Sequence, residues 1–253
     1  MDLSLRLDEK VAIVTGGAMG IGFGMVEGLA SVGANVIIAD INKEAAEKAA
    51  AKISADGGKA AAYEVDITDS EQVDNFVKVI IEQYGKIDIL VNNAGINRRN
   101  LCVNMPEEDW KKIIDINLTG AWIAAKAVIP SMMQQKSGRI INVCSIMGFV
   151  SLPELTAYSS SKGGIMQLTK ALALELADYN IQVNAVAPAY ILTELTSKLQ
   201  QNKEMYEDLI RRTPMKRFGT TQEIAGPVVF LASELTSFMT GVTIPVDGGW
   251  LAW

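Results

Sequence analysis

Tyr158 and Lys162 are the residues of this 253-residue chain whose types and spacing most directly suggest chemistry. Residues four apart on a helix lie on one face, one turn apart, so the ammonium can act on the phenol. A phenol ordinarily keeps its proton until about pH 10, and a nearby positive charge lowers that pKa. The chain has no histidine, so another group must carry any proton near neutral pH. Tyr158 is therefore a candidate base, and the alternative is a packed ring beside a solvated lysine.

A glycine-rich turn near the start of the chain is a candidate anion site. Residues 11–15 form a short β-branched, apolar run, which indicates a buried strand, and they lead into Gly16, Met19, Gly20 and Ile21. Glycine permits a tight turn and close approach of the backbone, and the N–H groups that open the following helix attract a pyrophosphate. The spacing differs from the general Gly-x-Gly-x-x-Gly fingerprint, so a turn that binds nothing stays open as an alternative.

Asp40 ends a second apolar run, residues 34–40, roughly 20 residues beyond the glycine turn. A carboxylate at that place accepts hydrogen bonds from an adenosine ribose and repels a 2′-phosphate. Because the uncharged Ile41 follows and the turn holds no Arg or Lys, Asp40 predicts NAD as the cofactor rather than NADP. The alternative is that Asp40 caps the alanine-rich helix expected over residues 44–52.

Strands are predicted to alternate with helices along the whole chain. After the first two, the runs that indicate strands cover residues 59–65, 87–91, 138–144, 181–187 and 242–246. The alternation predicts the α/β class with a single doubly wound parallel sheet, a Rossmann fold with helices on both faces, formed by residues 1–253 as one domain. The stretch from 190 to 220 is expected to be irregular, with a substrate lid at about 190–213.

Ligands of open parallel sheets bind outside the carboxyl ends of the strands. The residues that follow these ends should therefore share one rim, and they are Gly16, Asp40, Asp66, Asn93 and Ser145. Tyr158 opens the next helix from the same rim. The helical region expected over 106–134 carries Asn117 and Gly120, which are poor helix formers in a helix interior. We expect a functional distortion of the helix there.

Composition and charge narrow the choice of partners. The chain is 49% hydrophobic, enough for a sizeable core, and carries a formal net charge of −6. Nucleic acids and anionic membranes require basic surfaces, so neither is an expected partner. The sequence has no run of eighteen apolar residues and no signal-peptide pattern over residues 1–6, which predicts a cytoplasmic protein. Cys102 and Cys144 lack metal-ligand spacing, and no metal is expected.

Taken together, these motifs resemble the short-chain dehydrogenase/reductase family, and the resemblance runs nearly end to end. The residues that carry it are Thr15, Gly16, Gly20, Ile21, Gly22, Asp66, Asn92, Asn93, Ala94, Gly95, Asn117, Ser145, Tyr158, Lys162 and Pro188. The resemblance implies interconversion of a secondary alcohol and a ketone on a small hydroxy or keto substrate. The cofactor-binding residues that it implies, with Asp40 from the argument above, are Gly16, Met19, Gly20, Ile21, Asp40, Ile41, Asp66, Ile67, Asn93, Ala94, Gly95, Tyr158, Lys162, Pro188, Ile191 and Thr193.

The same resemblance implies the catalytic residues Asn117, Ser145, Tyr158 and Lys162. Ser145 would donate a hydrogen bond to the substrate oxygen, and Tyr158 would exchange a proton with it. Lys162 would also hold the nicotinamide ribose. Asn117 would connect Lys162 to solvent through water.

Two adjacent arginines, Arg98 and Arg99, follow the Asn-Asn-Ala-Gly turn close to this rim. Guanidinium groups suit carboxylates and phosphates, and the segment resembles that of gluconate and deoxygluconate dehydrogenases. We therefore expect a sugar acid or polyol as substrate, bound by Arg98, Arg99, Ser145, Tyr158 and Tyr190. The alternatives are that both arginines face solvent or a neighbouring subunit, and that apolar residues of the segment 190–213 cover a steroid, a diol or an acyl chain.

Other functions and the assembly also stay open. A 3-oxoacyl carrier-protein reductase belongs to the same family, and a non-catalytic dinucleotide sensor would be expected to lose the four catalytic residues. The resemblance implies a homotetramer. Trp250, Leu251 and Trp253 form an apolar terminus that a monomer has little reason to expose, unless the tail folds back on its own subunit.

Overall fold

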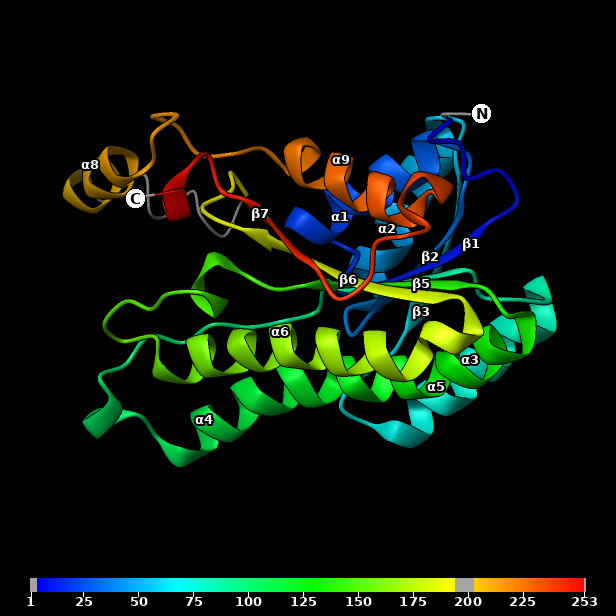
Figure 1. The fold of residues 1–253 in the computed structure, drawn as a ribbon, viewed down its shortest axis with the longest axis horizontal. Helices are drawn as coiled ribbons and strands as arrows, with labels where there is room; N and C mark the ends of the chain where they lie inside the picture. Colours follow the sequence, from blue (N-terminus) through cyan, green and yellow to red (C-terminus); the bar gives the residue numbers. More distant parts are fainter. Residues whose placement is uncertain (1–3, 194–202, 253) are drawn as a thin grey trace.

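The computed structural model describes residues 4–193 and 203–252, and it contains a parallel sheet (Figure 1). Within this part of the chain the sheet has seven strands in the order β3-β2-β1-β4-β5-β6-β7. Their bounds are β1 Val11–Thr15, β2 Asn35–Asp40, β3 Lys59–Glu64, β4 Ile89–Asn92, β5 Gly138–Val143, β6 Ile181–Pro188 and β7 Thr243–Val246. The order reverses direction between β1 and β4, so the prediction of a doubly wound α/β sheet is confirmed.

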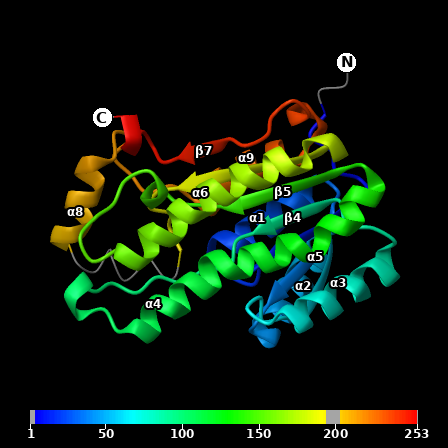
Figure 2. The same cartoon turned by 60° about the horizontal axis from the view of Figure 1, so that its bottom comes forward.

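Helices cover both faces of this sheet (Figures 1 and 2). One face carries α1 Gly20–Ser31, α2 Lys43–Ala55 and α9 Thr221–Ala232. The other side carries α3 Ser70–Tyr84, α4 Glu107–Ile114, α5 Gly120–Gln135 and α6 Thr156–Leu176. The central strands are buried along their length, because the helix layers remove both of their faces from water.

The stretch expected to be irregular contains a helix, α8 Lys203–Arg212, which lies beyond the carboxyl ends of the strands (Figure 1). The prediction was wrong there: α8 is mostly polar, although its few apolar residues recur at helical spacing. An ion pair between Lys203 and Glu207, one turn apart, helps to stabilise it. Much of the expected lid, residues 194–202, lies outside the described residues.

The distortion expected around Asn117 is present. Residues Asp115–Thr119 form a π-helical turn between α4 and α5. The glycine that follows is explained by packing, because a Cβ on Gly120 would lie 2.6 Å from Cδ1 of Ile67. Such wide turns are frequent at functional sites.

The continuous helical run Glu107–Gln135 is long and apolar enough to span a membrane, with a mean hydropathy of 1.3 over its most apolar window. Its inward side chains nevertheless pack in the protein core. Ile123, Val128 and Met132 are buried against α3 and the sheet. The composition of this helix is therefore accounted for by core packing.

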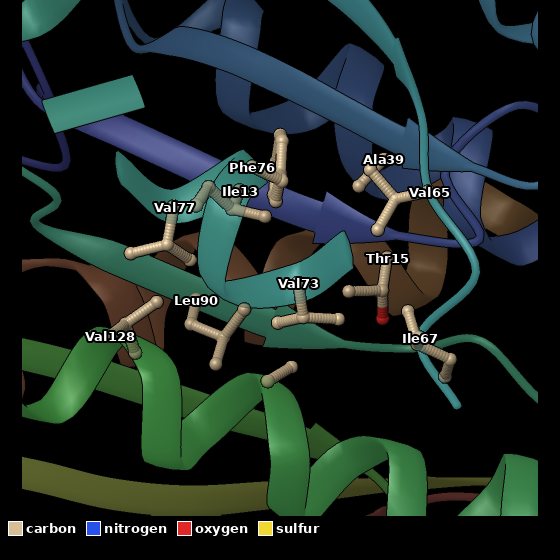
Figure 3. A pocket seen from close by; sticks show the side chains of 11 residues that line it. Ile13, Thr15, Ala39, Val65, Ile67, Val73, Phe76, Val77, Leu90 and Val128 are labelled. Atoms are coloured by element: carbon tan, nitrogen blue, oxygen red, sulfur yellow. The ribbon is translucent and has the colours of Figure 1, made fainter. Parts of the chain in front are cut away.

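A small apolar cavity of about 10 Å³ lies between the sheet and helices α3 and α5 (Figure 3). Side chains such as Phe76, Leu90 and Val128 line it, and Thr15 contributes the polar lining group. It contains none of the expected catalytic residues. The cavity is a packing defect beneath the rim rather than a candidate substrate site.

Candidate active site

The glycine turn after β1 has the shape of a phosphate cradle. Gly16 and Gly20 adopt positive φ angles of 61° and 56°, which favour glycine. A Cβ on Gly22 would lie 2.0 Å from the carbonyl oxygen of Gly16, so the start of α1 can approach the turn only without a side chain. Met19, the N-cap of α1, provides no side-chain hydrogen bond. The N–H groups that open α1 are thus left to an anion, and a dinucleotide pyrophosphate fits.

Asn93 fixes this turn from the end of the neighbouring strand β4. Its Nδ2 donates to the carbonyl oxygens of Thr15 at 3.0 Å and Gly16 at 2.8 Å. In return, Oγ1 of Thr15 accepts a hydrogen bond from the backbone N–H of Asn93 at 3.0 Å. A Cβ built on Gly16 would lie only 2.8 Å from the Cα of Ala94, so these two residues are closely packed. Asn93 therefore shapes the cradle, a contribution additional to the expected ribose contact.

Asp40 lies at the end of β2 with both carboxylate oxygens hydrogen-bonded. Oδ2 accepts from the N–H of Ala18 at 3.1 Å, and Oδ1 accepts from the N–H of Asn42 at 3.0 Å. The cap of α2 is Asn42, whose Oδ1 accepts from Ala45, so the alternative that Asp40 caps this helix is wrong. Asp40 instead joins the glycine turn to the end of β2, beside the exposed Ile41.

Asp66 follows β3 in a comparable way. Its Oδ1 accepts hydrogen bonds from the N–H of Thr68 at 2.9 Å and from Oγ1 of Thr68 at 2.7 Å. The next residue, Ile67, is buried against Gly120 of α5. The segment expected at the adenine is therefore fixed on both sides.

The four expected catalytic residues meet beyond the ends of β4 and β5. Lys162 is 4% exposed, and its Nζ donates to the carbonyl oxygen of Val143 at 2.8 Å. Asn117, in the π-helical turn, accepts from the N–H of Ile96 at 2.7 Å and donates to its carbonyl oxygen at 2.9 Å. A Cβ on Gly95 would lie 3.2 Å from Oδ1 of Asn117 and 3.6 Å from Nζ of Lys162. The turn after β4 thus contacts both Asn117 and Lys162, and Asn117 also donates to Oγ of Ser161 in α6 at 3.1 Å.

Ser145 is oriented to donate its proton. It follows β5, and its Oγ accepts a hydrogen bond from the N–H of Met147 at 3.1 Å. With that acceptor position occupied, the hydroxyl proton can point to the Tyr158 phenol or to a substrate oxygen. Ser145 lies close enough to the phenol of Tyr158 to lower its pKa.

Burial outweighs that effect and raises the pKa of Tyr158 to about 12. Burial likewise lowers the pKa of Lys162 to about 8. The expectation that Lys162 would depress the pKa of Tyr158 is therefore wrong for this structure: the Nζ of Lys162 lies 5.8 Å from the ring centroid and donates to Val143. The helical spacing predicts that the two groups share one face of the helix. It contains no information on how far burial removes them from water, and that burial shifts both pKa values.

The end of β6 provides the other side of the site. Pro188 ends this strand, and Ile191 pairs with Gly219 in an isolated parallel bridge. Ile191 is buried, and the chain then reaches Thr193, whose Cγ2 lies 3.6 Å from a Cβ built on Gly20. The segment that follows β6 therefore returns to the glycine cradle, as expected for cofactor-binding residues.

Arg98 and Arg99 are adjacent in sequence and were both expected to bind substrate, but they have different partners in the structure. Arg98 forms an ion pair with Asp109 of α4. Arg99 instead lies close enough to the phenol of Tyr190 for its positive charge to act on it. Burial raises the pKa of Tyr190, while Arg99 and Arg212 of α8 oppose that rise. Arg212 is a candidate site residue that the sequence argument missed, because α8 was expected to be irregular chain.

Tyr190 belongs to an aromatic cluster next to the catalytic residues. Its ring lies 5.6 Å from that of Phe218 and 5.3 Å from that of Trp250. Tyr158 packs against the same cluster. Trp250 is 9% exposed, so the described part of the tail folds back on its own chain, and the exposed aromatic terminus invoked for a tetramer is wrong at this residue. Trp253 lies outside the described residues.

The glycine cradle, the buried Lys162, and Ser145 with Tyr158 lie on one rim, an arrangement that suits hydride exchange between a bound dinucleotide and an alcohol or ketone. The family model described as enoyl-(acyl carrier protein) reductase matches residues 16–251. The chain belongs to the short-chain dehydrogenase/reductase family and is an oxidoreductase acting on CH–OH groups.

Similar proteins within the family have different substrates. The 3-oxoacyl-[acyl-carrier-protein] reductase FabG of Thermotoga maritima is 42% identical over 245 residues, covering 97% of this chain and 99% of that protein. The 5-keto-D-gluconate 5-reductase of Escherichia coli K12 is 40% identical over 245 residues, covering 97% and 96%. A solved gluconate 5-dehydrogenase from Burkholderia cenocepacia, in complex with NADP and tartrate, is 36% identical, with a TM-score of 0.95 and 98% of each chain covered.

Proposed function

We propose that this protein is an NAD(H)-dependent dehydrogenase that interconverts a secondary alcohol and a ketone, on a sugar acid or polyol. The observation that carries the proposal is the convergence of Asn117, Ser145, Tyr158 and Lys162 on one rim, beside the glycine cradle. A dinucleotide sensor on the same fold would have no need of this arrangement.

In this proposal the bound nicotinamide supplies hydride exchange with the substrate carbon. Ser145 donates a hydrogen bond to the substrate oxygen, for which its hydroxyl proton is already oriented. Tyr158, a neutral phenol because burial raises its pKa to about 12, donates its proton to the oxygen during ketone reduction. The phenolate left on Tyr158 regains a proton from solvent by way of Lys162, which lies one turn further along the inner side of α6, and Asn117 holds the neighbouring turn at Ile96.

Asp40 supports NAD over NADP. Its carboxylate ends β2 beside the glycine cradle, where it would repel a 2′-phosphate. The Burkholderia cenocepacia relative holds NADP, so cofactor choice requires a direct test.

We expect wild-type kcat/KM to be higher with NAD⁺ than with NADP⁺, and Asp40→Ser combined with Ile41→Arg to reverse that order. Asp40→Asn is the matched control, since it removes the charge and keeps an acceptor for Ala18. Equal or better efficiency of the wild type with NADP⁺ would show that Asp40 does not select NAD.

Arg99 supports an anionic hydroxy-sugar as substrate. Its positive charge acts on Tyr190, whose ring packs in the same cluster as Tyr158. A guanidinium there can bind a carboxylate held with its hydroxyl group at Tyr158 and Ser145. Arg98 is paired with Asp109 and serves as the matched control.

The substrate test is an NAD⁺ reduction screen over gluconate, 2-keto-3-deoxygluconate, polyols, 2,3-butanediol, hydroxysteroids and 3-hydroxyacyl thioesters. For a sugar acid, Arg99→Ala should raise KM by about 10–100-fold, the value of one charged hydrogen bond. Arg98→Ala should change it by less than about twofold. Turnover of a neutral substrate alone, with no effect of Arg99→Ala, contradicts the sugar-acid assignment.

A 3-oxoacyl carrier-protein reductase is the second candidate. It is favoured by the 42% identity to FabG of Thermotoga maritima. The net charge of −6 argues against docking of an acidic carrier. Reduction of a 3-oxoacyl thioester with NADPH, faster than that of any 5-keto sugar acid with NADH, would favour this second candidate.

We also propose one catalytic domain over residues 1–253, a cytoplasmic location and a homotetramer. Support for assembly comes from the outward faces of α5 and α6, where Trp122 is 45% and Leu174 83% exposed. The strand β7 also ends the sheet without a further described neighbour. Light scattering at micromolar concentration should give four times the chain mass of 27.3 kDa, and a monomeric mass would exclude the tetramer.

A further inference from the structure

The inner face of α6 continues beyond the catalytic residues. Tyr158, Lys162, Ile165 and Thr169 follow one another at helical spacing, so they share this face. Thr169 has no exposed surface, although it carries a hydroxyl group. A buried hydroxyl group is tolerated only when it is hydrogen-bonded, so its partners indicate its role.

Thr169 is the end of a buried chain of hydrogen bonds. Its Oγ1 accepts from Nδ2 of Asn142, on β5, at 2.9 Å. Oδ1 of Asn142 accepts from Nδ2 of Asn92, at the end of β4, also at 2.9 Å. The Nδ2 of Asn92 further donates to the carbonyl oxygen of Ala121 in α5 at 3.1 Å. We name this chain of Thr169, Asn142 and Asn92 the buried polar network.

The donors and acceptors of the buried polar network can be assigned in only one way. Oγ1 of Thr169 donates its proton to the carbonyl oxygen of Ile165 at 2.8 Å, so it can only accept from Asn142. Asn142 must therefore turn its amide nitrogen to Thr169 and its oxygen to Asn92. Rotating either amide by half a turn would bring oxygen against oxygen. The hydroxyl of Thr169 thus sets the orientation of both asparagines.

Each element joined by the buried polar network carries, or lies next to, a residue of the candidate site. Asn142 lies three residues before Ser145, and Asn92 directly precedes Asn93. Ala121 directly follows the glycine after the π-helical turn that holds Asn117. Asn92 and Asn142 are also register partners of the neighbouring strands β4 and β5. The network therefore fixes α6 to β5, β4 and α5 beneath the catalytic residues.

We infer that Thr169 is a positioning residue that sets the placement of α6 on β5, and through it the distance from Tyr158 to Ser145. Thr169 does not contact the site itself. Lys162 fixes α6 to Val143 near the rim, and Thr169 fixes it to the adjacent residue Asn142 two turns deeper. Two attachments at neighbouring strand residues prevent the helix from sliding or turning along the strand. The inference rests on the proposed dehydrogenase activity.

The matched pair of variants is Thr169→Val and Thr169→Ser. Valine keeps the shape of threonine and removes the hydroxyl group, whereas serine keeps the hydroxyl group. Thr236→Val is the control for loss of a buried hydroxyl elsewhere: Thr236 is also fully buried, and its Oγ1 donates to carbonyl oxygens near the end of α9. If Thr169→Val does not accumulate as folded protein, Thr169→Ala takes its place, since no methyl group then faces Asn142.

We expect Thr169→Val to lower kcat by about tenfold or more, because small misplacements of reacting groups have large effects on rate. Its KM for NAD⁺ should change by a smaller factor than kcat does, since the glycines and Asn93 of the cradle keep their own hydrogen bonds. Thr169→Ser should restore most of kcat, and Thr236→Val should leave kcat unchanged at a temperature where all variants are folded. A kcat of Thr169→Val near wild type, or an equal loss in Thr236→Val, overturns the inference.

Hydrogen exchange of the same variants separates this inference from the proposed function. In Thr169→Val, peptides covering β5 and α6 should exchange faster, while α2 and β3 should not change. If wild-type protein turns over no alcohol with either cofactor, the proposed function fails, and the exchange pattern still tests the positioning. Unchanged exchange in β5 and α6 overturns the inference whatever the activity.

Discussion

Replacing Lys162 with methionine should change how the free energy of unfolding depends on pH. Burial lowers the pKa of Lys162 from 10.5 to about 8, so the folded chain binds this proton more weakly than the unfolded chain does. Between these two pKa values the unfolded state binds more protons, and stability therefore rises with pH. Below about pH 8 both states carry the proton, and the full cost of burying the charge is present.

The size of the effect follows from the same two values. The charge costs about 3 kcal/mol at pH 7 and about 1 kcal/mol at pH 10, using about 1.4 kcal/mol for each pKa unit. The wild type should thus gain about 2 kcal/mol over this range relative to Lys162→Met. Measurements should stop near pH 10, because the raised pKa of Tyr158 lowers stability at higher pH.

Urea denaturation at pH 7, 8, 9 and 10 measures this difference. Lys170→Met is the matched control, because Lys170 lies on the same helix but is exposed. Its stability should follow the wild-type pH dependence, whereas that of Lys162→Met should depart from it by the amount above. Parallel curves for wild type and Lys162→Met would refute the claim that a charged lysine is buried at a cost.

Three further outcomes test the site. Tyr158→Phe should lower kcat by about 10²–10⁴-fold with little change in cofactor affinity, and turnover within a few-fold of wild type would remove the phenol from the mechanism. Because burial raises the pKa of Tyr158 to about 12, kcat for alcohol oxidation should rise up to pH 10, and a flat profile would contradict this. Gly22→Ala should abolish cofactor binding in a fluorescence titration, since its Cβ would lie 2.0 Å from the oxygen of Gly16. Gly163→Ala, whose Cβ meets nothing nearer than 3.9 Å, should bind normally, and equal binding by both variants would contradict the packing argument.

The fold was predictable because the strands are continuous apolar runs with glycine or polar residues after them. The strand predicted over 11–15 matches β1, and that predicted over 138–144 ends one residue beyond β5. Asn117 and Gly120 also gave a usable signal, since poor helix formers marked the π-helical turn. Among the α-helices of the described residues, α8 was missed, because most of its residues are polar.

The parts that escaped prediction depend on groups distant in sequence. The sequence shows Asn92, Asn142 and Thr169 as unrelated polar residues, although the fold joins them. The pKa of Tyr158 depends on how much water the aromatic cluster excludes, which helical spacing does not contain. The difference between Arg98 and Arg99 likewise rests on their partners, Asp109 and Tyr190.

The crowding around the glycine cradle limits how its cofactor selectivity can be engineered. Side chains cannot be added at Gly16 or Gly22, because each Cβ would overlap backbone atoms, and Asn93 cannot be changed without releasing the turn. A designer seeking a different dinucleotide therefore has most room at the exposed side chains beside the cradle. Ile41, at the end of β2, is 68% exposed and Met19 is 58% exposed, so a substitution there meets solvent instead of a neighbouring strand. A library at these two positions, with the glycines and Asn93 kept, would sample much of the freedom that the packing leaves.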